Sequence, residues 1–210
     1  MNTTNTPSDR ITESSIYGSH LPEMETIKEE LLLWIEDFRK EITKQTGSDP
    51  VEHSLGRIKS DESMRDKCIR KGLPFTVDSV LHEIHDAIGI RVVCAFLSDV
   101  YTIRDRIVKF PGCSIHAEKD YIRHAKPNGY RSYHLILNVR GYFVEVQIRT
   151  ISMDTWAALE HHLKYKKHVS GNDSLIVSEL KRCADELAST DISMQTIRDM
   201  IFEEGDQTGT

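Results

Sequence analysis

The spacing of apolar residues predicts a long amphipathic helix at each end of the chain. Between residues 21 and 46, apolar side chains recur at helical spacing and form one stripe, the pattern of a helix with a single buried face. A second long helix is expected from about Leu175 to Phe202, where the spacing is heptad-like and Thr190 is the polar break. Its apolar positions are Ile176, Leu180, Cys183, Leu187, Met194, Ile197 and Ile201.

The middle of the chain has the patterns of β-strands. Residues 88–97 form a nearly continuous apolar run rich in β-branched residues, which is typical of a central strand covered on both faces. Alternating apolar and polar residues predict two more strands, over 134–139 and 143–149, joined by a hairpin turn at 140–141. A short strand is expected over 113–117.

Shorter helices are expected between and after these strands. One begins after Ser60, a suitable N-cap, and ends at Gly72; the others cover residues 77–85, 99–109 and 151–166. Without the short strand at 113–117, the order is βαββα inside flanking helices, which predicts an α/β or α+β fold in which helices surround a sheet.

Length and composition indicate one domain. We expect it over residues 21–204, with a disordered polar leader at 1–20 and a flexible tail at 205–210. No apolar run approaches the ~20 residues of a membrane-spanning helix, and the N-terminus lacks a signal pattern. The four scattered cysteines form no C-x-x-C pair. We therefore expect a cytoplasmic protein with reduced thiols and no membrane partner.

The charges are unevenly distributed. The formal net charge of -6 argues against a broad DNA-binding surface. However, residues 57–71 hold six basic and three acidic side chains, and residues 119–131 hold four basic and one acidic. These two basic segments suggest local phosphate binding, with solvated helix faces as the alternative. An RNA regulator stays open, although nothing in the sequence indicates one.

Polar residues interrupt the predicted strands at specific positions. Alternation places Glu145, Gln147 and Arg149 on one face of strand 143–149, while Asp86 stands at the entrance of strand 88–97 and Arg91 lies inside it. Mg²⁺ is typically held by one or two carboxylates together with substrate phosphates. These residues suit a metal-assisted transferase that uses nucleotides, although structural ion pairs would explain them about as well.

A second group of candidate ligands surrounds the helix after Ser60. Ser63, Lys67 and Arg70 fall on one face of this helix. Arg57 and Lys59 precede its start, where backbone N–H groups also point outward. These side chains are five potential contacts to a phosphate or a base.

Four segments carry a family resemblance. They are GRIKS at 56–60, HDAIGIRVVC at 85–94, KDYIRHAKPNGYRSYHLI at 119–136 and EVQIRTISMDTWAALEHHLKYK at 145–166. In this order they resemble the synthetase domain of RelA/SpoT-type alarmone synthetases, specifically the stand-alone small alarmone synthetases. The chain looks more similar to the RelP subgroup than to the RelQ subgroup, through KGLP at 71–74 and KDYI.

The resemblance implies a GTP/GDP pyrophosphokinase with a mixed, nucleotidyltransferase-like sheet. Such an enzyme transfers pyrophosphate from ATP to the ribose 3′-hydroxyl of GDP or GTP with Mg²⁺, giving AMP and the alarmone ppGpp or pppGpp of the stringent response. Because 210 residues leave no room for the hydrolase domain of longer relatives, alarmone hydrolysis is not expected. The alternative is a catalytically weak nucleotide- or RNA-binding regulator with the same fold.

The resemblance also assigns roles to residues. Asp86 would be a Mg²⁺ ligand, and Glu145 would contact the metal or act as general base, so both are candidate catalytic and metal residues. Arg57 and Arg91 would sandwich adenine, and Tyr130 would stack on guanine. The residues expected to hold the ATP phosphates are Lys59, Ser63, Lys67 and Arg70. Those expected around the acceptor nucleotide are Lys119, Lys126, His134, Gln147, Asp154 and Glu160.

The two long amphipathic helices bear on assembly. If a small sheet leaves part of the apolar stripe on these helices uncovered, the exposed part would favour burial against a second copy of the chain. Similar small synthetases are homotetramers, which the resemblance makes the first expectation here. The alternative is a monomer whose terminal helices pack on their own sheet or on each other.

Overall fold

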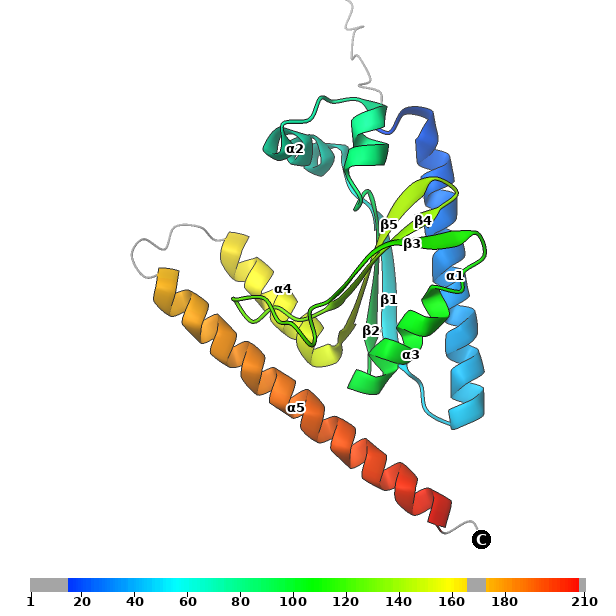
Figure 1. The fold of residues 1–210 in the computed structure, drawn as a ribbon, viewed down its shortest axis with the longest axis vertical. Coiled ribbons are helices and arrows are strands. Elements are labelled where there is room, and N and C mark those ends of the chain that lie inside the picture. Colours follow the sequence, from blue (N-terminus) through cyan, green and yellow to red (C-terminus); the bar gives the residue numbers. More distant parts are fainter. Residues whose placement is uncertain (1–14, 166–172, 208–210) are drawn as a thin grey trace, which may run out of the picture.

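The computed structural model describes residues 15–165 and 173–207 (Figure 1). Besides a 3₁₀ turn at Gly18–His20 and a π-helical turn at Ser79–Glu83, ten helices and strands form in the described part of the chain. They are α1 (Leu21–Thr46), β1 (Val51–Ile58), α2 (Asp61–Lys71), β2 (Ile88–Cys94), α3 (Leu97–Ile107), β3 (Cys113–Asp120), β4 (Tyr133–Val139), β5 (Tyr142–Thr150), α4 (Ile151–Tyr165) and α5 (Asp173–Gln207).

The strands form one mixed sheet in the order β1-β2-β5-β4-β3. The central strands β2 and β5 are parallel, and the other neighbouring pairs are antiparallel. β4 and β5 make the predicted hairpin, with Arg140 and Gly141 both at positive φ in the turn. The predicted fold class, a mixed sheet surrounded by helices, is confirmed.

Helices α1 and α3 cover one face of the sheet and leave the other open (Figure 1). The stripe of α1 is buried as predicted, with Met24, Ile27 and Leu31 inaccessible to solvent. At Gly56 on β1 the helix comes so near that a methyl group there would lie 2.9 Å from the Leu32 side chain. This close packing fixes β1 against α1 and directs the next residue of β1 to the open face.

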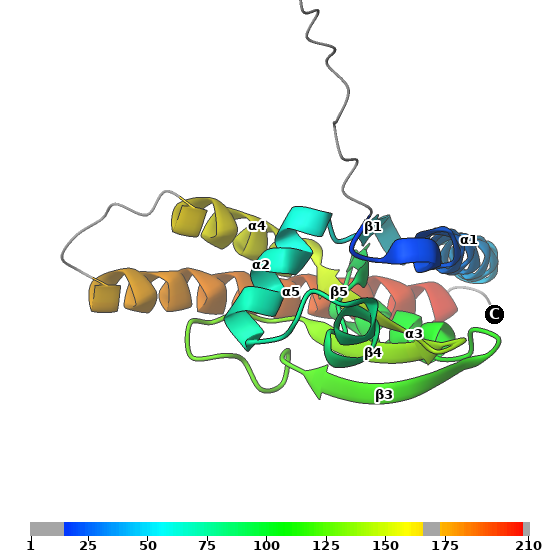
Figure 2. The same ribbon diagram turned by 90° about the horizontal axis from the view of Figure 1, so that it is seen from above.

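Helices α4 and α5 form an antiparallel pair beside the sheet, as two perpendicular views agree (Figures 1 and 2). The indole N–H of Trp156 on α4 donates to the backbone oxygen of Leu180 on α5 at 2.9 Å. Near its other end α5 returns to α3, where Arg198 pairs with the buried Asp99 at 2.7 Å. The long helix is therefore attached to the rest of the molecule at several points along its length, and these two are among them.

One strand was absent from the sequence prediction. β1 has a single fully buried apolar residue, Val51, while its Leu55 is 57% exposed. An edge strand with so few buried positions lacks the alternation by which the other strands were identified. Other differences are at boundaries: the helix expected over 77–85 is the π-helical turn, β2 ends at Cys94 rather than 97, and β3 continues to Asp120 rather than 117.

The expected leader at 1–20 is too long, because residues 15–20 belong to the folded part. Ile16 and Tyr17 are buried, and the Tyr17 hydroxyl donates to the backbone oxygen of Lys59 at 2.5 Å. Asp61 accepts hydrogen bonds from the Ser15 hydroxyl and the Ile16 N–H. Likewise α5 continues through the first three residues of the expected tail at 205–210. Residues 1–14 and 208–210 lie outside the described residues.

Among residues 15–165 and 173–207, no helix has the length and hydrophobicity needed to cross a membrane.

Candidate active site

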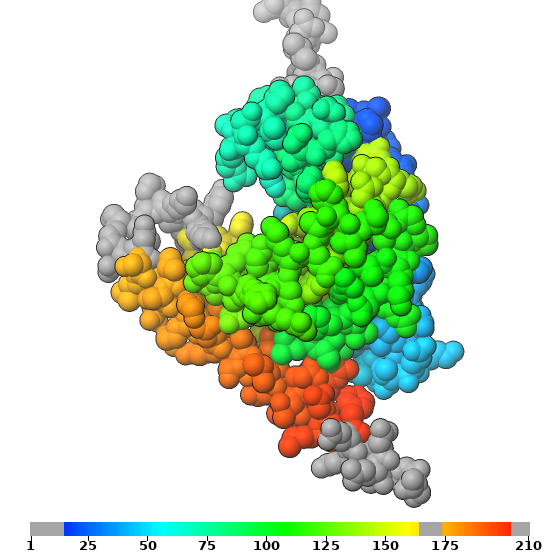
Figure 3. All heavy atoms as spheres, in the orientation of Figure 1, coloured from blue at the N-terminus to red at the C-terminus, as the bar shows by residue number. Residues whose placement is uncertain are grey.

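A cleft lies on the open face of the sheet, beside β1, β2 and β5. Its volume is about 340 Å³, and its lining includes Arg57, Asp86, Arg91 and Glu145. A second hollow of about 520 Å³ continues from Arg57 along α2 and reaches Ser63. Both volumes are in the range of small-molecule sites. The space-filling view shows the surface hollowed between α2 and α4 (Figure 3).

Two lysines from different elements converge on Asp86, which lies just before β2. Nζ of Lys59, after β1, is 2.5 Å from Oδ2, and Nζ of Lys67 on α2 is 2.6 Å from the same oxygen. Burial acts to raise the pKa of Asp86, but the hydrogen bonds from both lysines outweigh it and hold this pKa below its usual value. The carboxylate is therefore ionised at neutral pH.

The other oxygen of Asp86 fits a metal ligand. Oδ1 is buried and has no hydrogen-bond partner among the described residues. A buried, unpaired carboxylate oxygen costs free energy, and carboxylate oxygens are the ligands that Mg²⁺ prefers. No cluster of three His, Cys, Asp or Glu side chains within residues 15–165 and 173–207 is placed to hold a metal ion. The residues present thus fit a divalent cation whose coordination is completed by nucleotide phosphates.

Glu145 faces the same cleft. The parallel pairing of β2 and β5 places it beside Gly89, three residues after Asp86. Its Oε1 is 3.4 Å from Nδ1 of His134, and Nε2 of Gln147 donates to its Oε2 at 3.0 Å. Burial raises the pKa of Glu145, and nearby Asp86 raises it further. The hydrogen bonds with His134 and Gln147 outweigh both, so this pKa lies below its usual value.

The two arginines predicted to hold adenine lie on the same face of neighbouring strands. The register pairs Arg57 with Gly89 and Leu55 with Arg91, so the two guanidinium groups flank a residue without a side chain. A methyl group at Gly89 would lie 3.8 Å from the Arg57 side chain, which is ordinary van der Waals contact, so Arg57 extends over Gly89. Planar guanidinium groups stack well on flat rings. The structure brings these two residues together around a base-sized opening.

The predicted phosphate-binding helix is α2. Its N-cap is Ser60 as predicted, since the hydroxyl oxygen of Ser60 accepts the N–H of Ser63 at 3.3 Å. Ser63 and Arg70 line the second hollow together with Lys59, and Lys67 reaches Asp86 from the same helix. Two of the four predicted phosphate contacts, Lys59 and Lys67, therefore touch Asp86, and Lys59 also lines the second hollow with Ser63 and Arg70.

On the other side of Glu145, Arg149 joins several predicted acceptor residues. This side chain is 5% exposed, and its Nη2 donates at 2.7 Å both to the Tyr130 hydroxyl and to Oε1 of Gln147. The Tyr130 hydroxyl is also 2.8 Å from Nε2 of His134. Arg149 was not among the predicted site residues. The sequence did contain a signal for it, because the alternation of the strand places Arg149 on the same face as Glu145.

Asp154 links the two sides of the cleft. Its Oδ1 accepts from Nη1 of Arg149 at 3.0 Å and lies 3.4 Å from Nη1 of Arg91. One carboxylate thus contacts Arg91 of the predicted adenine site and Arg149, which touches the predicted acceptor residues Tyr130 and Gln147.

The remaining predicted acceptor residues are less central. Nζ of Lys126 lies 4.8 Å from the centre of the Tyr130 ring, within reach of a cation–π interaction. Lys119 is exposed on edge strand β3, where it pairs in register with His134. Glu160 accepts from the Asn128 amide at 3.2 Å. It therefore contacts the loop that carries Tyr130 through Asn128, whose side-chain oxygen accepts the Tyr130 N–H at 3.2 Å.

A family model provides the decisive comparison. The model, described as a region found in RelA/SpoT proteins, matches residues 56–170. This chain belongs to the RelA/SpoT family. The resemblance read from the sequence is therefore confirmed, and the matched region includes every predicted site residue from Arg57 to Glu160. The assignment to the RelP subgroup stays a prediction.

Curated relatives and solved structures give the same result. Over 149 residues the chain is 42% identical to the GTP pyrophosphokinase YwaC of Bacillus subtilis, covering 66% of this chain and 70% of that protein. Over 187 residues it is 33% identical to the GTP pyrophosphokinase YjbM of the same organism, covering 83% and 85%. The crystal structure of small alarmone synthetase 1 from Bacillus subtilis bound to its product pppGpp superposes with a TM-score of 0.73. That match has 29% identity and covers 85% of this RelA/SpoT-family chain and 94% of the other.

Proposed function

We propose that this protein transfers pyrophosphate from ATP to the 3′-hydroxyl of GDP or GTP, producing AMP and ppGpp or pppGpp. Family membership and the activity named for its relatives support this function. The observation that carries the proposal is the position of Asp86 and Glu145, which line one cleft between a pair of arginines and an aromatic pocket. The reaction takes place in the cytoplasm, where both nucleotides are available.

In this proposal ATP occupies the side of the cleft formed by β1, β2 and α2. Arg57 and Arg91 hold adenine between them, and the phosphates extend toward α2. Lys59 and Lys67 already meet at Asp86, so the transferred phosphates arrive where two ammonium groups and an ionised carboxylate converge. Asp86 and Glu145 would hold Mg²⁺, which when bound neutralises negative charge on the phosphates.

The acceptor occupies the other side, with guanine stacked on Tyr130 and its ribose directed toward Glu145. Gln147 and His134 hold the Glu145 carboxylate in place from two directions. Glu145 then either accepts the proton of the 3′-hydroxyl or contacts the metal. The exposed Lys119 and Lys126 supply positive charge for the acceptor's own phosphates.

A transfer assay tests this function. ATP labelled in its γ-phosphate is incubated with Mg²⁺ and with GMP, GDP or GTP in turn, and the products are separated by chromatography. We expect AMP and a labelled guanosine product that migrates more slowly than its acceptor. If none of the three nucleotides yields such a product while calorimetry detects nucleotide or RNA binding, the protein is a binding regulator and the proposed function is wrong.

We also propose that the protein assembles through α5, with a homotetramer as the first expectation. The C-terminal half of α5 exposes several large apolar side chains, among them Met194, Ile197 and Ile201, at 47%, 48% and 63% exposure. Contiguous exposed apolar surface of this kind is typical of an interaction site. The sequence also pointed to Leu187, but that residue lines a small cavity between α4 and α5 and is part of the internal packing.

Light scattering checks the assembly. At micromolar concentration we expect a mass well above the 24.1 kDa of one chain. Ile197→Glu combined with Ile201→Glu should lower that mass without changing the circular dichroism spectrum, because both side chains are exposed. Arg182→Glu, an exposed position on the same helix, is the control. A wild-type mass of one chain would refute the assembly.

A further inference from the structure

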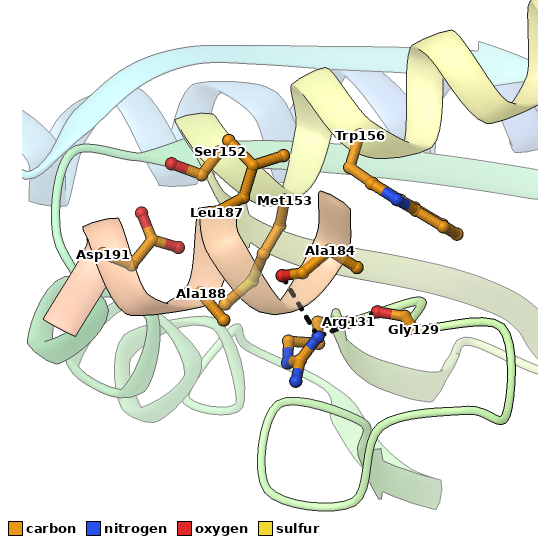
Figure 4. A pocket seen from close by; sticks show the side chains of 9 residues that line it. All are labelled: Gly129, Arg131, Ser152, Met153, Trp156, Ala184, Leu187, Ala188 and Asp191. Carbon is orange, nitrogen blue, oxygen red and sulfur yellow. Dashed lines mark hydrogen bonds between the residues drawn. The ribbon is translucent and has the colours of Figure 1, made fainter. Parts of the chain in front are cut away.

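The loop between β3 and β4 carries Tyr130, and the residues on either side of Tyr130 are fixed to α5. Arg131 turns away from the nucleotide cleft. Its Nη2 is 2.9 Å from Oδ1 of Asp185, and its Nη1 donates to the backbone oxygens of Ala184 at 3.3 Å and Gly129 at 3.1 Å. Figure 4 shows Arg131 next to α5, with a dashed line to Ala184. One side chain thus ties both neighbours of Tyr130 to the helix.

Gly129 lies almost directly on the helix backbone. Its φ is +90°, and a methyl group there would lie 2.6 Å from Cβ of Ala184 and 3.1 Å from Cα of Lys181. Only glycine combines this backbone conformation with such an approach. The loop and α5 are therefore packed together more closely than any other side chain at position 129 would permit.

The space between the loop, α4 and α5 is too small for a ligand. Its volume is about 10 Å³, room for one water molecule at most, and Met153, Trp156 and Leu187 line its sides (Figure 4). Trp156 also lies 6.3 Å from the Tyr130 ring, centre to centre. This region is a packed joint that connects Tyr130 to the helix pair.

We propose that Arg131 is a positioning residue of the acceptor site: by fixing the loop to α5 it presets Tyr130 for the guanine base. The inference rests on the proposed function and extends it, because it makes α5 part of the acceptor site without any contact to nucleotide. A loop held in its binding conformation loses less entropy when the ligand binds. ATP binds on the opposite side of the cleft and gains nothing from this contact.

The same contact couples acceptor binding to α5. A guanosine nucleotide that favours the fixed loop must in turn stabilise the segment of α5 on which the loop rests, since coupling between two sites is reciprocal. This segment is the part of α5 from Lys181 to Ala188, about two helical turns. It precedes the exposed apolar stretch of α5, so a shift of the helix reaches Tyr130 through Arg131 and Gly129.

Steady-state kinetics test the proposal with Arg131→Ala, and Arg182→Ala serves as the matched control. Arg182 is exposed one residue after Lys181, and its partners Glu179 and Glu186 are on its own helix. Losing a charge-assisted hydrogen bond should raise the KM for GDP about tenfold in Arg131→Ala. The KM for ATP should be unchanged, Arg131→Lys should recover part of the loss, and Arg182→Ala should match wild type.

Hydrogen exchange provides a readout independent of turnover. GDP alone should slow exchange of the amides from Lys181 to Ala188 in the wild type, ATP alone should not, and Arg131→Ala should remove the GDP effect.

If Arg131→Ala does not fold, Asp185→Asn, at a partly exposed site, carries the same test. Equal rises in both KM values with a lower melting temperature, or no change in either, would overturn the inference. If the wild type binds GDP but makes no product, only the proposed function is wrong. The exchange measurement still tests the positioning role of Arg131, because it does not depend on turnover.

Discussion

Glu145→Gln is expected to lower the rate of pyrophosphoryl transfer by about 10²–10⁴-fold, the usual scale for a general acid–base group. The substitution keeps the shape of the side chain and its distance from Gln147 and His134 but removes the negative charge. GDP binding, measured by calorimetry, should stay close to wild type because the stacking and phosphate contacts lie elsewhere. Glu118→Gln on the edge strand β3, which β4 separates from β5, is the control and should keep its activity.

The pH dependence tests whether Glu145 acts as an ionised carboxylate, which both of its proposed roles require. Burial raises its pKa, but His134 and Gln147 bring it below the usual value for glutamate. The carboxylate is ionised above this lowered pKa. If it acts as the base, the acid limb of kcat/KM for GDP should lie below the usual glutamate range and disappear in Glu145→Gln. Near-native turnover in this variant would show that the base or metal ligand is another residue.

Helices and strands could be predicted from the sequence where either one face or the whole element is buried along its length. The stripe of α1, the apolar run of β2 and the alternation of β4 and β5 each reflect a constant environment along the element, so their periodicity is legible. β1 is an edge strand in which Leu55 is exposed. At Gly56 there is no side chain, because the strand backbone packs directly against α1. The environment of β1 changes from residue to residue, so its sequence has no regular alternation of apolar and polar residues.

The site divides in a similar way. Strand parity alone places Glu145, Gln147 and Arg149 together, and helix periodicity places Ser63 and Lys67 together. Contacts between elements do not follow from either rule, because they depend on sheet order and on helix docking.

The convergence of Lys59 and Lys67 on Asp86 requires β1, which the sequence analysis did not identify. The contact of Arg131 with Asp185 joins residues 54 positions apart on a loop and a helix. Motif resemblance supplied several of these residues, yet it did not indicate which of them touch.

Asp86→Ala is expected to lower the rate of pyrophosphoryl transfer by about 10²–10⁴-fold, the same scale as Glu145→Gln. The cause differs, because this variant loses a candidate metal ligand. Removing the carboxylate removes Oδ1, which has no hydrogen-bond partner in the part of the chain that the structure describes, and leaves Lys59 and Lys67 without their shared partner. Burial already lowers the pKa of Lys59 in spite of Asp86. Without the carboxylate this pKa should fall further, and the free energy of unfolding should drop by ~1–3 kcal/mol. Asp78→Ala, at an exposed position before the π-helical turn, is the control.

Stability and activity together separate a metal ligand from a structural ion pair. The lowered pKa of Asp86 means that its ion pairs stabilise the fold above the unfolded-state pKa and that this contribution is lost as pH falls through the folded-state pKa. Asp86→Asn removes the charge and keeps hydrogen-bonding capacity, so much of the fold's stability should return. If Asp86 serves only the fold, activity should return with stability. If it binds the cation, Asp86→Asn should stay inactive at temperatures where it is fully folded, and raising Mg²⁺ should not restore the wild-type rate.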